Sequence, residues 1–382
     1  MFDILVVGCG LSGAVIARYF AEKGKKVMIW ERRNHIAGNM YDYIDDYGIL
    51  VQKYGPHIFH TNQKGLYDYI CRFGKWNDFR LIYGAVIDGI CTPTPFNFQT
   101  IDDFYSEHEA KELKNRINTA FADRQTATVL ELLEHTDPII CAYAKFLFEK
   151  DYSIYTAKQW GISASQIDPS VLKRVPLRFS YEMEHFDDTY QVMPQVSYTA
   201  FFENLLVHKN IKIELGIDAL KHLSVADNGE SLLIDGVKTE KTVVYTGALD
   251  ELFGLCEGAL PYRSLRFEWR YERIDSFQDM PIIAYPQAPD YTRITEYKKL
   301  PVQDVFGTTY AVEYPLSYVQ GQGNEPYYPV LTDESNKQYE IYRKKAKQIS
   351  NLYPCGRLAD FKYYNMDQTL HRAIMMCREI GV

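Results

Sequence analysis

The sequence predicts an α/β protein that combines a Rossmann-like dinucleotide-binding domain with an inserted helical domain and an antiparallel β-sheet domain, with interleaved segments. Three observations predict this class. An apolar strand pattern at the start of the chain runs into a glycine-rich turn and a helix. Apolar residues recur at helical spacing between residues 101 and 160, and apolar and polar residues alternate over 262–315. At 382 residues the chain suits two or three domains.

The glycine-rich turn follows the strand pattern of residues 3–7 and reads G-x-G-x-x-G through Gly8, Gly10 and Gly13. The first glycine permits a tight turn, the second lets the backbone approach a pyrophosphate, and the third lets the helix pack close to the strand. The helix entered at Ser12 directs unpaired N–H groups and the positive end of its dipole at the phosphates. Glycine triplets also occur in ordinary turns, so a purely structural βαβ unit is the alternative.

A second strand pattern, residues 26–30, ends at Glu31, whose carboxylate is placed to accept hydrogen bonds from an adenosine ribose. An acidic residue at this point favours a free 2′-hydroxyl, and therefore NAD or FAD over NADP. The following segment, from Arg32 to Asn39, contains a glycine and is placed to return the backbone to the cofactor. The order strand, turn, helix, strand and acid favours a dinucleotide site over the structural alternative.

The remaining patterns suggest how the chain is divided. We expect residues 1–80 to form the nucleotide-binding domain, with returning segments at about 195–250 and 350–382, where residues 243–247 resemble a buried strand. Residues 81–180 are expected to form a mainly helical domain with a mobile substrate loop at about 161–178. Residues 251–330 are expected to form the antiparallel sheet domain.

Composition limits the classes of partner. A net charge of −8 gives no general attraction for nucleic acid or anionic membranes. The seven cysteines are scattered and never spaced C-x-x-C, which favours reduced thiols over a disulfide framework or a zinc site. No apolar run reaches the roughly 18 residues that span a bilayer, and the chain starts with a strand pattern rather than a signal peptide. We therefore expect a soluble cytoplasmic protein with no nucleic-acid partner, no membrane insertion and no metal.

Two side-chain groups are candidates for ligand contact. His57 and His60 lie three residues apart beside a turn, but no acidic third ligand in a recognisable pattern accompanies them. Contact with a ligand and packing in a hydrogen-bonded core both stay open for them. Further along, residues 155–160 supply rings for stacking on a base and an amide for its edge, from Tyr155, Thr156, Gln159 and Trp160. The alternative there is an aromatic helix end capped by Gly161.

Arginines and the C-terminal segment complete the candidates. Arg174, Arg263 and Arg293 stand near proline or tyrosine, and arginine forks suit the paired phosphates of a nucleotide diphosphate, although most arginines are solvated surface residues. Near the C-terminus, Gly356-Arg357 and a helix start near Met366 are devices that hold the second part of a large cofactor. This late return of the chain favours FAD over NAD.

Over almost its whole length the chain resembles the UDP-galactopyranose mutase family. The resemblance rests on eight motifs that occur in order and with similar separations. They are the glycine motif at residues 8–13 with Glu31, and the segments 54–61, 155–161, 172–179, 262–265, 291–296, 325–329 and 356–358.

The resemblance implies a flavoenzyme that interconverts the pyranose and furanose forms of a nucleotide-diphosphate sugar without net redox change, first of all UDP-galactopyranose and UDP-galactofuranose. It implies FAD that is active when reduced by NAD(P)H or another external donor. The reduced flavin N5 then attacks the anomeric carbon and expels the nucleotide diphosphate. The likeness also suggests a homodimer.

Residue roles follow from the same resemblance. Arg174 matches an arginine that swings in to neutralise the diphosphate, and Arg293, Tyr314 and Tyr363 match further diphosphate contacts. His60 matches a histidine beside the flavin. The catalytic candidates are Arg174, Arg293 and His60. The cofactor candidates are Gly8, Gly10, Ser12, Gly13, Glu31, Arg32, Asn39, His57, Gly356, Arg357 and Met366. The substrate candidates are Tyr155, Thr156, Gln159, Trp160, Arg174, His185, Arg263, Arg293, Tyr314, Tyr328 and Tyr363.

Four positions depart from the family pattern near the sugar. Leu81 and Ile283 stand where asparagines are usual, His185 replaces a tyrosine and Asn365 replaces an aspartate. An unpaired sugar hydroxyl costs on the order of 1–3 kcal/mol. A less polar sugar, such as the 6-deoxyhexose of dTDP-fucopyranose, is therefore an alternative substrate.

Two rival functions come from other classes. A flavin amine oxidase or dehydrogenase would share the N-terminal unit but would need no set of diphosphate-binding arginines. A non-catalytic nucleotide-binding or NAD-sensing protein would bind no flavin.

Overall fold

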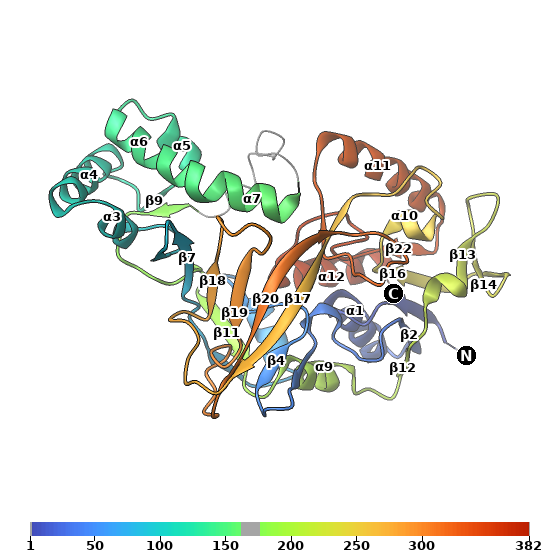
Figure 1. The fold of residues 1–382 in the computed structure, drawn as a ribbon. Coiled ribbons are helices and arrows are strands. Elements are labelled where there is room, and N and C mark those ends of the chain that lie inside the picture. Colours follow the sequence, from blue (N-terminus) through green and yellow to red (C-terminus); the bar gives the residue numbers. More distant parts are fainter. Residues whose placement is uncertain (1, 162–175, 382) are drawn as a thin grey trace.

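A five-stranded parallel sheet forms the part of the protein that carries the glycine-rich turn (Figure 1). The structure is a computed structural model that describes residues 2–161 and 176–381. The strands follow the order β12 (Ile211–Leu215), β2 (Val27–Glu31), β1 (Ile4–Val7), β16 (Thr242–Tyr245) and β22 (Leu352–Pro354). All four pairings are parallel. Strand β16 pairs directly with β1, which confirms the predicted returning strand at residues 243–247.

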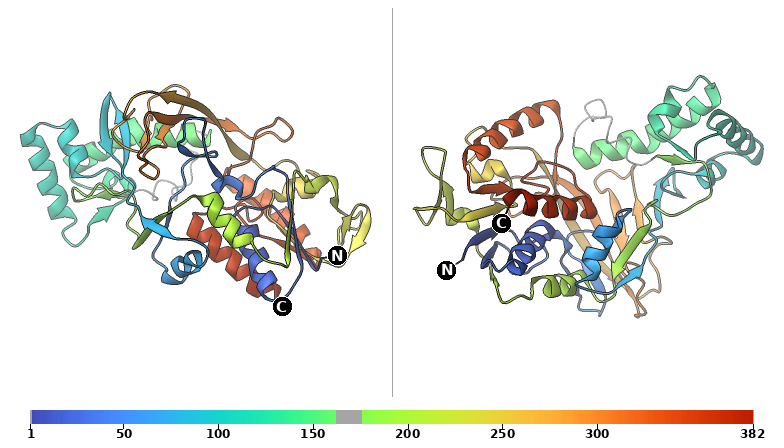
Figure 2. Two further views of the ribbon diagram at one scale, coloured as in Figure 1. Left: turned by 90° about the horizontal axis from the view of Figure 1, so that it is seen from below. Right: turned by 180° about the vertical axis from the view of Figure 1, so that it is seen from behind.

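Helices cover both faces of this sheet because the side chains of β1 alternate between two apolar cores. Ile4 and Val6 pack in the core that contains α1 (Leu11–Glu22), α9 (Tyr198–Leu206) and α12 (Met366–Ile380). Leu5 and Val7 pack in the opposite core, with α10 (Leu249–Leu252) and α11 (Asp333–Gln348). Both views of Figure 2 show α12 lying beside α1, so the two ends of the chain meet on one face.

A seven-stranded sheet forms the centre of the molecule (Figure 1). Its order is β21 (Tyr328–Pro329), β17 (Tyr262–Glu272), β20 (Thr308–Ser317), β19 (Arg293–Glu296), β18 (Ile282–Ala284), β7 (Tyr83–Ile87) and β8 (Ile90–Pro93). Every pairing is antiparallel except that of β18 with β7. We expected several short strands here, but β17 and β20 pair over ten residues. Together with the helices and the parallel sheet, this architecture confirms the predicted fold class.

Strands β7 and β8 differ from the expected division of the chain, because we assigned residues from 81 onward to the helical domain. They extend the seven-stranded sheet instead. Strand β7 forms a hairpin with β8, and its other neighbour in the sheet is β18, which lies about 200 residues later in the chain. The hairpin has a local signal in Asp88-Gly89, whereas the pairing with β18 that attaches it to the sheet leaves no local pattern in the sequence.

The helical segment projects from one end of the molecule (Figure 1) and has its own apolar core. It consists of α3 (Phe98–Phe104), α4 (Glu107–Ala120), α5 (Val129–Leu133), α6 (Pro138–Leu147), a π-helical turn (Phe148–Tyr152) and α7 (Ser153–Trp160). Capping boxes start three of these helices, with Thr100 reaching back to Asn97, Glu109 to Ser106 and Glu131 to Thr128. The expected substrate loop falls largely on residues 162–175, outside the described residues.

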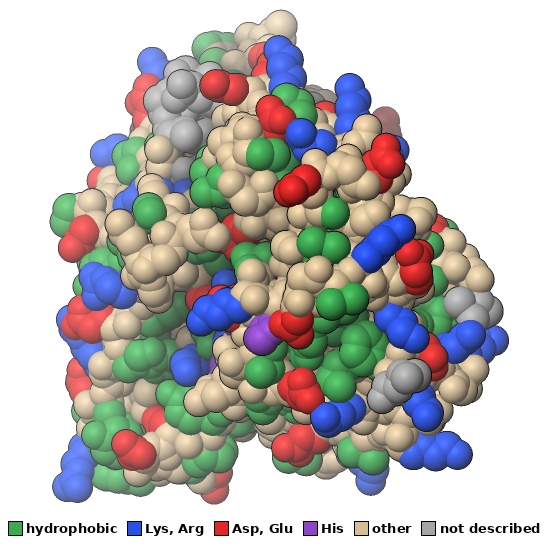
Figure 3. Space-filling view, turned by 90° about the vertical axis from the view of Figure 1, so that its right-hand side faces the viewer, with side chains coloured by type: hydrophobic (Ala, Val, Ile, Leu, Met, Phe, Trp, Pro, Cys, Tyr) green, Lys and Arg blue, Asp and Glu red, His purple; other side chains and the backbone are tan. Residues whose placement is uncertain are grey.

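Smaller elements connect these parts. The sheet β5 (Phe59–Thr61), β11 (Tyr190–Pro194) and β6 (Trp76–Asp78) carries His60, and α2 (Lys64–Cys71) follows it. The other strands are β3 (Asp42–Ile44) with β4 (Leu50–Gln52), β9 (Thr126–Ala127) with β10 (Leu177–Arg178), and β13 (Leu223–Val225) with β14 (Leu232–Ile234) and β15 (Val237–Thr239). On the face shown in Figure 3, acidic and basic side chains intermingle.

Candidate active site

The glycine turn has the geometry that its sequence predicts. Gly8 has a φ of +99°, and a Cβ added there would lie 2.1 Å from Thr246 Oγ1. A Cβ at Gly13 would lie 2.0 Å from the backbone oxygen of Gly8, so only glycine lets α1 pack this close to the turn. Gly10 precedes α1, whose N-terminus has neither a side-chain cap nor an acidic residue in its first turn. These N–H groups are therefore available to an anion.

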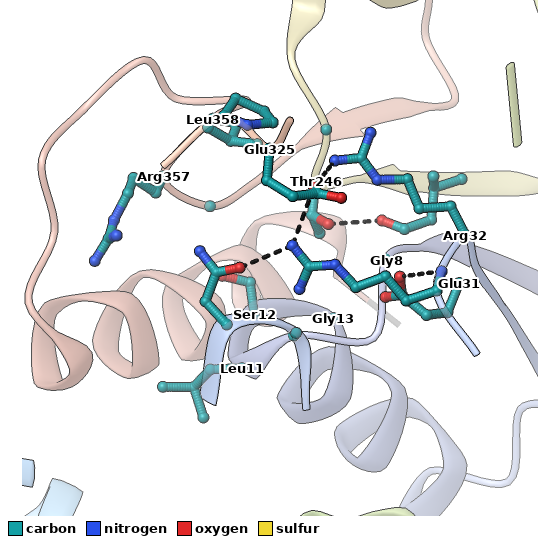
Figure 4. Close-up of a pocket in the computed structure, with 18 of the residues that line it drawn as sticks. Gly8, Leu11, Ser12, Gly13, Glu31, Arg32, Thr246, Glu325, Arg357 and Leu358 are labelled. Atoms are coloured by element: carbon teal, nitrogen blue, oxygen red, sulfur yellow. Dashed lines mark hydrogen bonds and ion pairs between the residues drawn. The ribbon is translucent and has the colours of Figure 1, made fainter. Parts of the chain in front are cut away.

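Glu31 is held rigidly at the end of β2. Its Oε2 accepts a hydrogen bond from the Cys9 N–H at 2.7 Å, and its Oε1 accepts one from the Arg33 N–H at 3.0 Å. Arg32 and Arg33 both form ion pairs with Glu325, which comes from the distant loop after β20. Figure 4 shows Glu31, Arg32 and Glu325 around the start of α1. A carboxylate oriented in this way keeps lone pairs for a ribose.

One cavity collects all eleven of the residues that we predicted for the cofactor. Further lining residues were missed by sequence reasoning, including the 217–220 segment after β12, Thr246 and Leu358. Residues 217–220 carry no motif that marks them as cavity residues. They reach the cavity because β12 lies next to β2, and this pairing cannot be read from the segment itself. The cavity extends from Glu31 past the glycine turn to Arg357, Met366 and His57.

A cluster of tyrosines surrounds Arg293. The Nε and Nη2 atoms of Arg293 lie 2.9 and 2.8 Å from Glu313 Oε2 on the neighbouring strand. Burial lowers the pKa of Arg293, but the Glu313 carboxylate outweighs this effect and raises the pKa well above its ordinary value. The Tyr83 and Tyr155 hydroxyls lie 3.4 Å apart, and burial raises the pKa of both. The cluster therefore offers a permanent cation and neutral phenol groups to an anionic ligand.

Arg357 lies between the cofactor cavity and this cluster. Its guanidinium lies 4.9 Å from the ring centroid of Tyr328 and 5.5 Å from that of Tyr363, and the two rings stack at 5.2 Å. It also donates hydrogen bonds to the backbone oxygens of Tyr327 and Tyr364, at 3.3 and 2.8 Å. The structure thus brings Tyr328 and Tyr363 together with a predicted cofactor residue.

The three candidate histidines have different surroundings. His57 lines the cavity, and burial lowers its pKa to about 4. Burial also lowers the pKa of His185 to about 4, and its Nδ1 lies 2.9 Å from the carbonyl oxygen of Thr94. His60 Nδ1 lies 2.7 Å from Asp188 Oδ2. Because both pKa values lie well below 7, His57 and His185 are neutral near pH 7. The single ring proton of His185 is then donated from Nδ1 to the carbonyl oxygen.

Helix α7 is anchored to the seven-stranded sheet at its C-terminal end. Arg263, which is 8% exposed, donates from Nε to the backbone oxygen of Gln159 at 3.0 Å and from Nη1 to Ser317 Oγ at 3.1 Å. Lys158, which sequence reasoning passed over, donates to three backbone oxygens in the loop before Arg293, each at 2.7 Å. These contacts fix Tyr155 and the buried Thr156 beside the cluster. Arg174 lies outside the described residues, as does the side chain of Trp160.

Two expectations need correction. Tyr314 lies on the face of the sheet opposite Arg293, because it neighbours Glu313 on β20, and its hydroxyl donates to Glu268 Oε2 at 3.1 Å. It is not part of the Arg293 cluster. Ile283 likewise faces away, since Ala284 is the residue paired with Arg293 across the ladder. The small side chain nearest Arg293 on β18 is therefore Ala284.

Leu81 and Asn365 are the remaining departures from the family pattern. Leu81 is 2% exposed and packs in the core that contains α1, and its backbone oxygen accepts the His185 N–H at 2.7 Å. Asn365 directly precedes α12, and its N–H donates to Gln368 Oε1 at 3.0 Å. The second of these positions is next to Met366 of the cofactor cavity.

Within residues 2–161 and 176–381, no group of three or more His, Cys, Asp or Glu side chains is placed to hold a metal ion. In the same part of the chain, no helix has the length and apolar character needed to cross a bilayer.

Comparison with known proteins identifies relatives over the full length of the chain. The UDP-galactopyranose mutase family profile matches residues 150–363, and that of the NAD(P)-binding Rossmann-like domain matches residues 6–73. The chain is 34% identical to a UDP-galactopyranose mutase from Mycoplasma pneumoniae, over 99% of this chain and 96% of that protein. It is 33% identical to a dTDP-fucopyranose mutase from Escherichia coli, over 98% and 97%.

Solved structures show the same fold. A crystal structure of reduced UDP-galactopyranose mutase has a TM-score of 0.73 at 13% identity, covering 100% of this chain and 94% of that one. Putrescine oxidase bound to putrescine has a TM-score of 0.58 at 10% identity, covering 99% and 98%. The likeness to the oxidase is one of fold alone. Profile and full-length relatives agree that this chain belongs to the UDP-galactopyranose mutase family, the flavin-dependent isomerases that interconvert the pyranose and furanose forms of nucleotide sugars.

Proposed function

We propose that the protein interconverts the pyranose and furanose forms of a nucleotide-diphosphate hexose, with UDP-galactopyranose as the first candidate and dTDP-fucopyranose as the alternative. One observation carries the proposal: the cavity lined by the glycine turn borders a cluster in which Arg293 and Arg357 converge with four tyrosines. The tyrosines are Tyr83, Tyr155, Tyr328 and Tyr363. An oxidase would need no such arrangement of cations beside its cofactor.

FAD fits the cavity by the chemistry of its lining. Gly8, Gly10 and Gly13 leave room for a pyrophosphate at the uncapped start of α1, and Glu31 is oriented to accept ribose hydroxyls. Arg357 would neutralise phosphate charge, and Met366 and His57 would border the flavin end. When bound and reduced, by NAD(P)H or another donor, the flavin supplies the nucleophile for the anomeric carbon.

The chain itself would stabilise the leaving group. Bond cleavage at the anomeric carbon places negative charge on the departing nucleotide diphosphate, which is the charge that a fixed guanidinium stabilises. Arg293 is suited to this role, since Glu313 keeps it charged and in place. Tyr155, Tyr328 and Tyr363 would add hydroxyl donors. By resemblance, Arg174 would supply a second guanidinium.

The sugar pocket keeps both substrates open. On the Arg293 face of the sheet, Ala284 offers no hydrogen-bonding group, which favours a sugar with fewer hydroxyls near that strand. The neutral His185 donates its Nδ1 proton in a hydrogen bond to the backbone oxygen of Thr94. Its Nε2 can therefore accept a hydrogen bond from a hydroxyl of the sugar.

The deciding experiment uses the purified, dithionite-reduced protein with UDP-galactopyranose, UDP-N-acetylgalactosamine and dTDP-fucopyranose, with products separated by chromatography. We expect one of them to be converted to its furanose form, and no conversion by the oxidised protein. Stoichiometric oxidation of a substrate would favour the oxidase alternative, and a protein without a flavin spectrum would favour the non-catalytic one. A homodimer and a cytoplasmic location also stay predictions, testable by light scattering and cell fractionation.

A further inference from the structure

His60 belongs to a hydrogen-bonded network that the cofactor cavity does not include. The network consists of His60 and Asn62 on and after β5, and Asp188, Thr189 and Gln191 around the start of β11. The His60 ring stacks on Phe186 with centroids 3.8 Å apart. Its side chain is 13% exposed and that of Asp188 is 23% exposed, so the pair is largely shielded from bulk solvent.

The direction of each hydrogen bond in the network is fixed from one end. The backbone N–H of Thr189 can only donate, and it lies 2.9 Å from Asn62 Oδ1. The amide nitrogen of Asn62 therefore faces Asp188, and it donates to Oδ1 at 2.9 Å. Asp188 Oδ2 remains for His60 Nδ1 at 2.7 Å. A carboxylate oxygen can only accept here, so Nδ1 of His60 carries a proton.

Gln191 holds the turn that supplies Asp188. Its side-chain nitrogen donates to the backbone oxygens of Phe186 and Asp188, both at 3.0 Å, and the residue is 1% exposed. Gln191 also pairs with His60 across the strands. The ring, its carboxylate partner and its stacking partner are therefore held as one unit.

We propose that Asp188 is a positioning residue that keeps the proton of His60 on Nδ1, so that Nε2 is the nitrogen able to take up and return a proton. The inference rests on the proposed function and on the family resemblance, by which His60 matches a histidine beside the flavin. Interconversion of the ring forms moves one proton from the hydroxyl that closes the new ring to the oxygen released from the old ring. A nitrogen that exchanges a proton without breaking its supporting hydrogen bond suits this transfer.

The substitution Asp188→Asn tests the polarity of the network. Because Thr189 still holds the Asn62 oxygen, the Asn62 NH2 still faces residue 188, and we expect the oxygen of the new amide to face Asn62 and its NH2 to face His60 Nδ1. The His60 proton then moves to Nε2. We expect kcat to fall by about 100-fold with KM for the nucleotide sugar changed by less than about threefold. Long-range ¹H–¹⁵N spectra of histidine-labelled protein report the tautomer of the neutral ring, with His60→Gln assigning its signals.

An exchange of the two side chains should restore the original form. In the double variant Asn62→Asp with Asp188→Asn, the Thr189 N–H donates to the new carboxylate, which accepts from the new amide. The oxygen of that amide then accepts from His60 Nδ1. We expect the Nδ1–H signal to return and kcat to recover to within about tenfold of the wild type. Asp235→Asn is the matched control, because Asp235 pairs with His222 Nδ1 at 2.8 Å on the exposed surface.

Three results would overturn the inference. They are an Nδ1–H signal that survives Asp188→Asn, a double variant with a restored signal but no gain in kcat, and an equal loss of kcat in Asp235→Asn. Flavin content and thermal unfolding of each variant separate these results from misfolding. If the wild type converts no nucleotide sugar, the proposed function fails, while the spectra still decide whether Asp188 sets the His60 tautomer.

Discussion

Replacing Gly13 by alanine should disrupt the cofactor turn although it favours the helix. The added Cβ would lie 2.0 Å from the backbone oxygen of Gly8, whereas C···O contacts are ordinarily about 3.3 Å or more. Helix α1 and the turn must therefore separate by more than about 1 Å. Overpacking of this kind typically lowers the free energy of unfolding by about 1–3 kcal/mol. Because the contact is with the backbone and very short, we expect a cost at the upper end of this range, ~3 kcal/mol. The gain in helix propensity returns about 1 kcal/mol.

A matched glycine isolates the contact. Gly65 lies in the first turn of α2, and a Cβ there would meet nothing within 4 Å. Gly65→Ala should raise the free energy of unfolding by about 0.5–1 kcal/mol, whereas Gly13→Ala should lower it by about 2 kcal/mol. Urea unfolding of the flavin-free proteins measures both.

Flavin affinity is the second measurement on these two variants. The loss of one charge-assisted hydrogen bond to a phosphate, about 1.5–3 kcal/mol, should weaken FAD binding by about 10- to 100-fold in Gly13→Ala alone. Quenching of flavin fluorescence on titration measures the affinity. A Gly13→Ala protein as stable as Gly65→Ala, with wild-type flavin affinity, would refute the reasoning.

Three further outcomes are expected. Arg174→Ala should lower turnover by about 100-fold or more at unchanged flavin content, and near-normal turnover would remove its diphosphate role. Arg293→Met leaves Glu313, 4% exposed, without its partner and should cost about 3–5 kcal/mol of stability, and adding Glu313→Gln should restore stability but not turnover. Because burial lowers the pKa of His185 from 6.5 to about 4, the unfolded chain binds more protons between these pH values and stability falls as the pH drops below 6.5. The free energy of unfolding should be about 2 kcal/mol lower at pH 5 than at pH 7.5. His185→Phe should remove this difference, and plots of unfolding free energy against pH that run parallel for the two proteins would contradict the prediction.

The predictions that the structure bears out depend on signals carried by short segments. The turn at residues 8–13 is recognisable because its three glycines answer steric demands within a few residues of each other. Helix α5 lies within residues 101–160, where helical spacing was predicted, and its apolar spacing and its cap at Thr128 are local as well. The returning strand β16 was recognisable from its continuous apolar run.

The features that sequence reasoning missed depend on pairing between distant strands. Tyr314 and Ile283 were expected at the site, but a strand turns successive side chains to opposite faces, and the pairing with Arg293 decides which face they take. Strand β7 and the 217–220 segment reach their positions through neighbours far away in the chain. Asp188 carries no motif of its own, and only the pairing of β11 with β5 brings it to His60.

By itself the sequence determined the fold class, the anchor for the ADP half of a dinucleotide and the family, because glycine spacing, an acidic strand end and ordered motifs are encoded in consecutive residues. The tertiary structure alone decided which side chains converge on Arg293, which histidines are neutral and which carboxylate holds His60. These properties depend on register, burial and hydrogen-bond direction, and they arise only when strands separated by a hundred or more residues are paired.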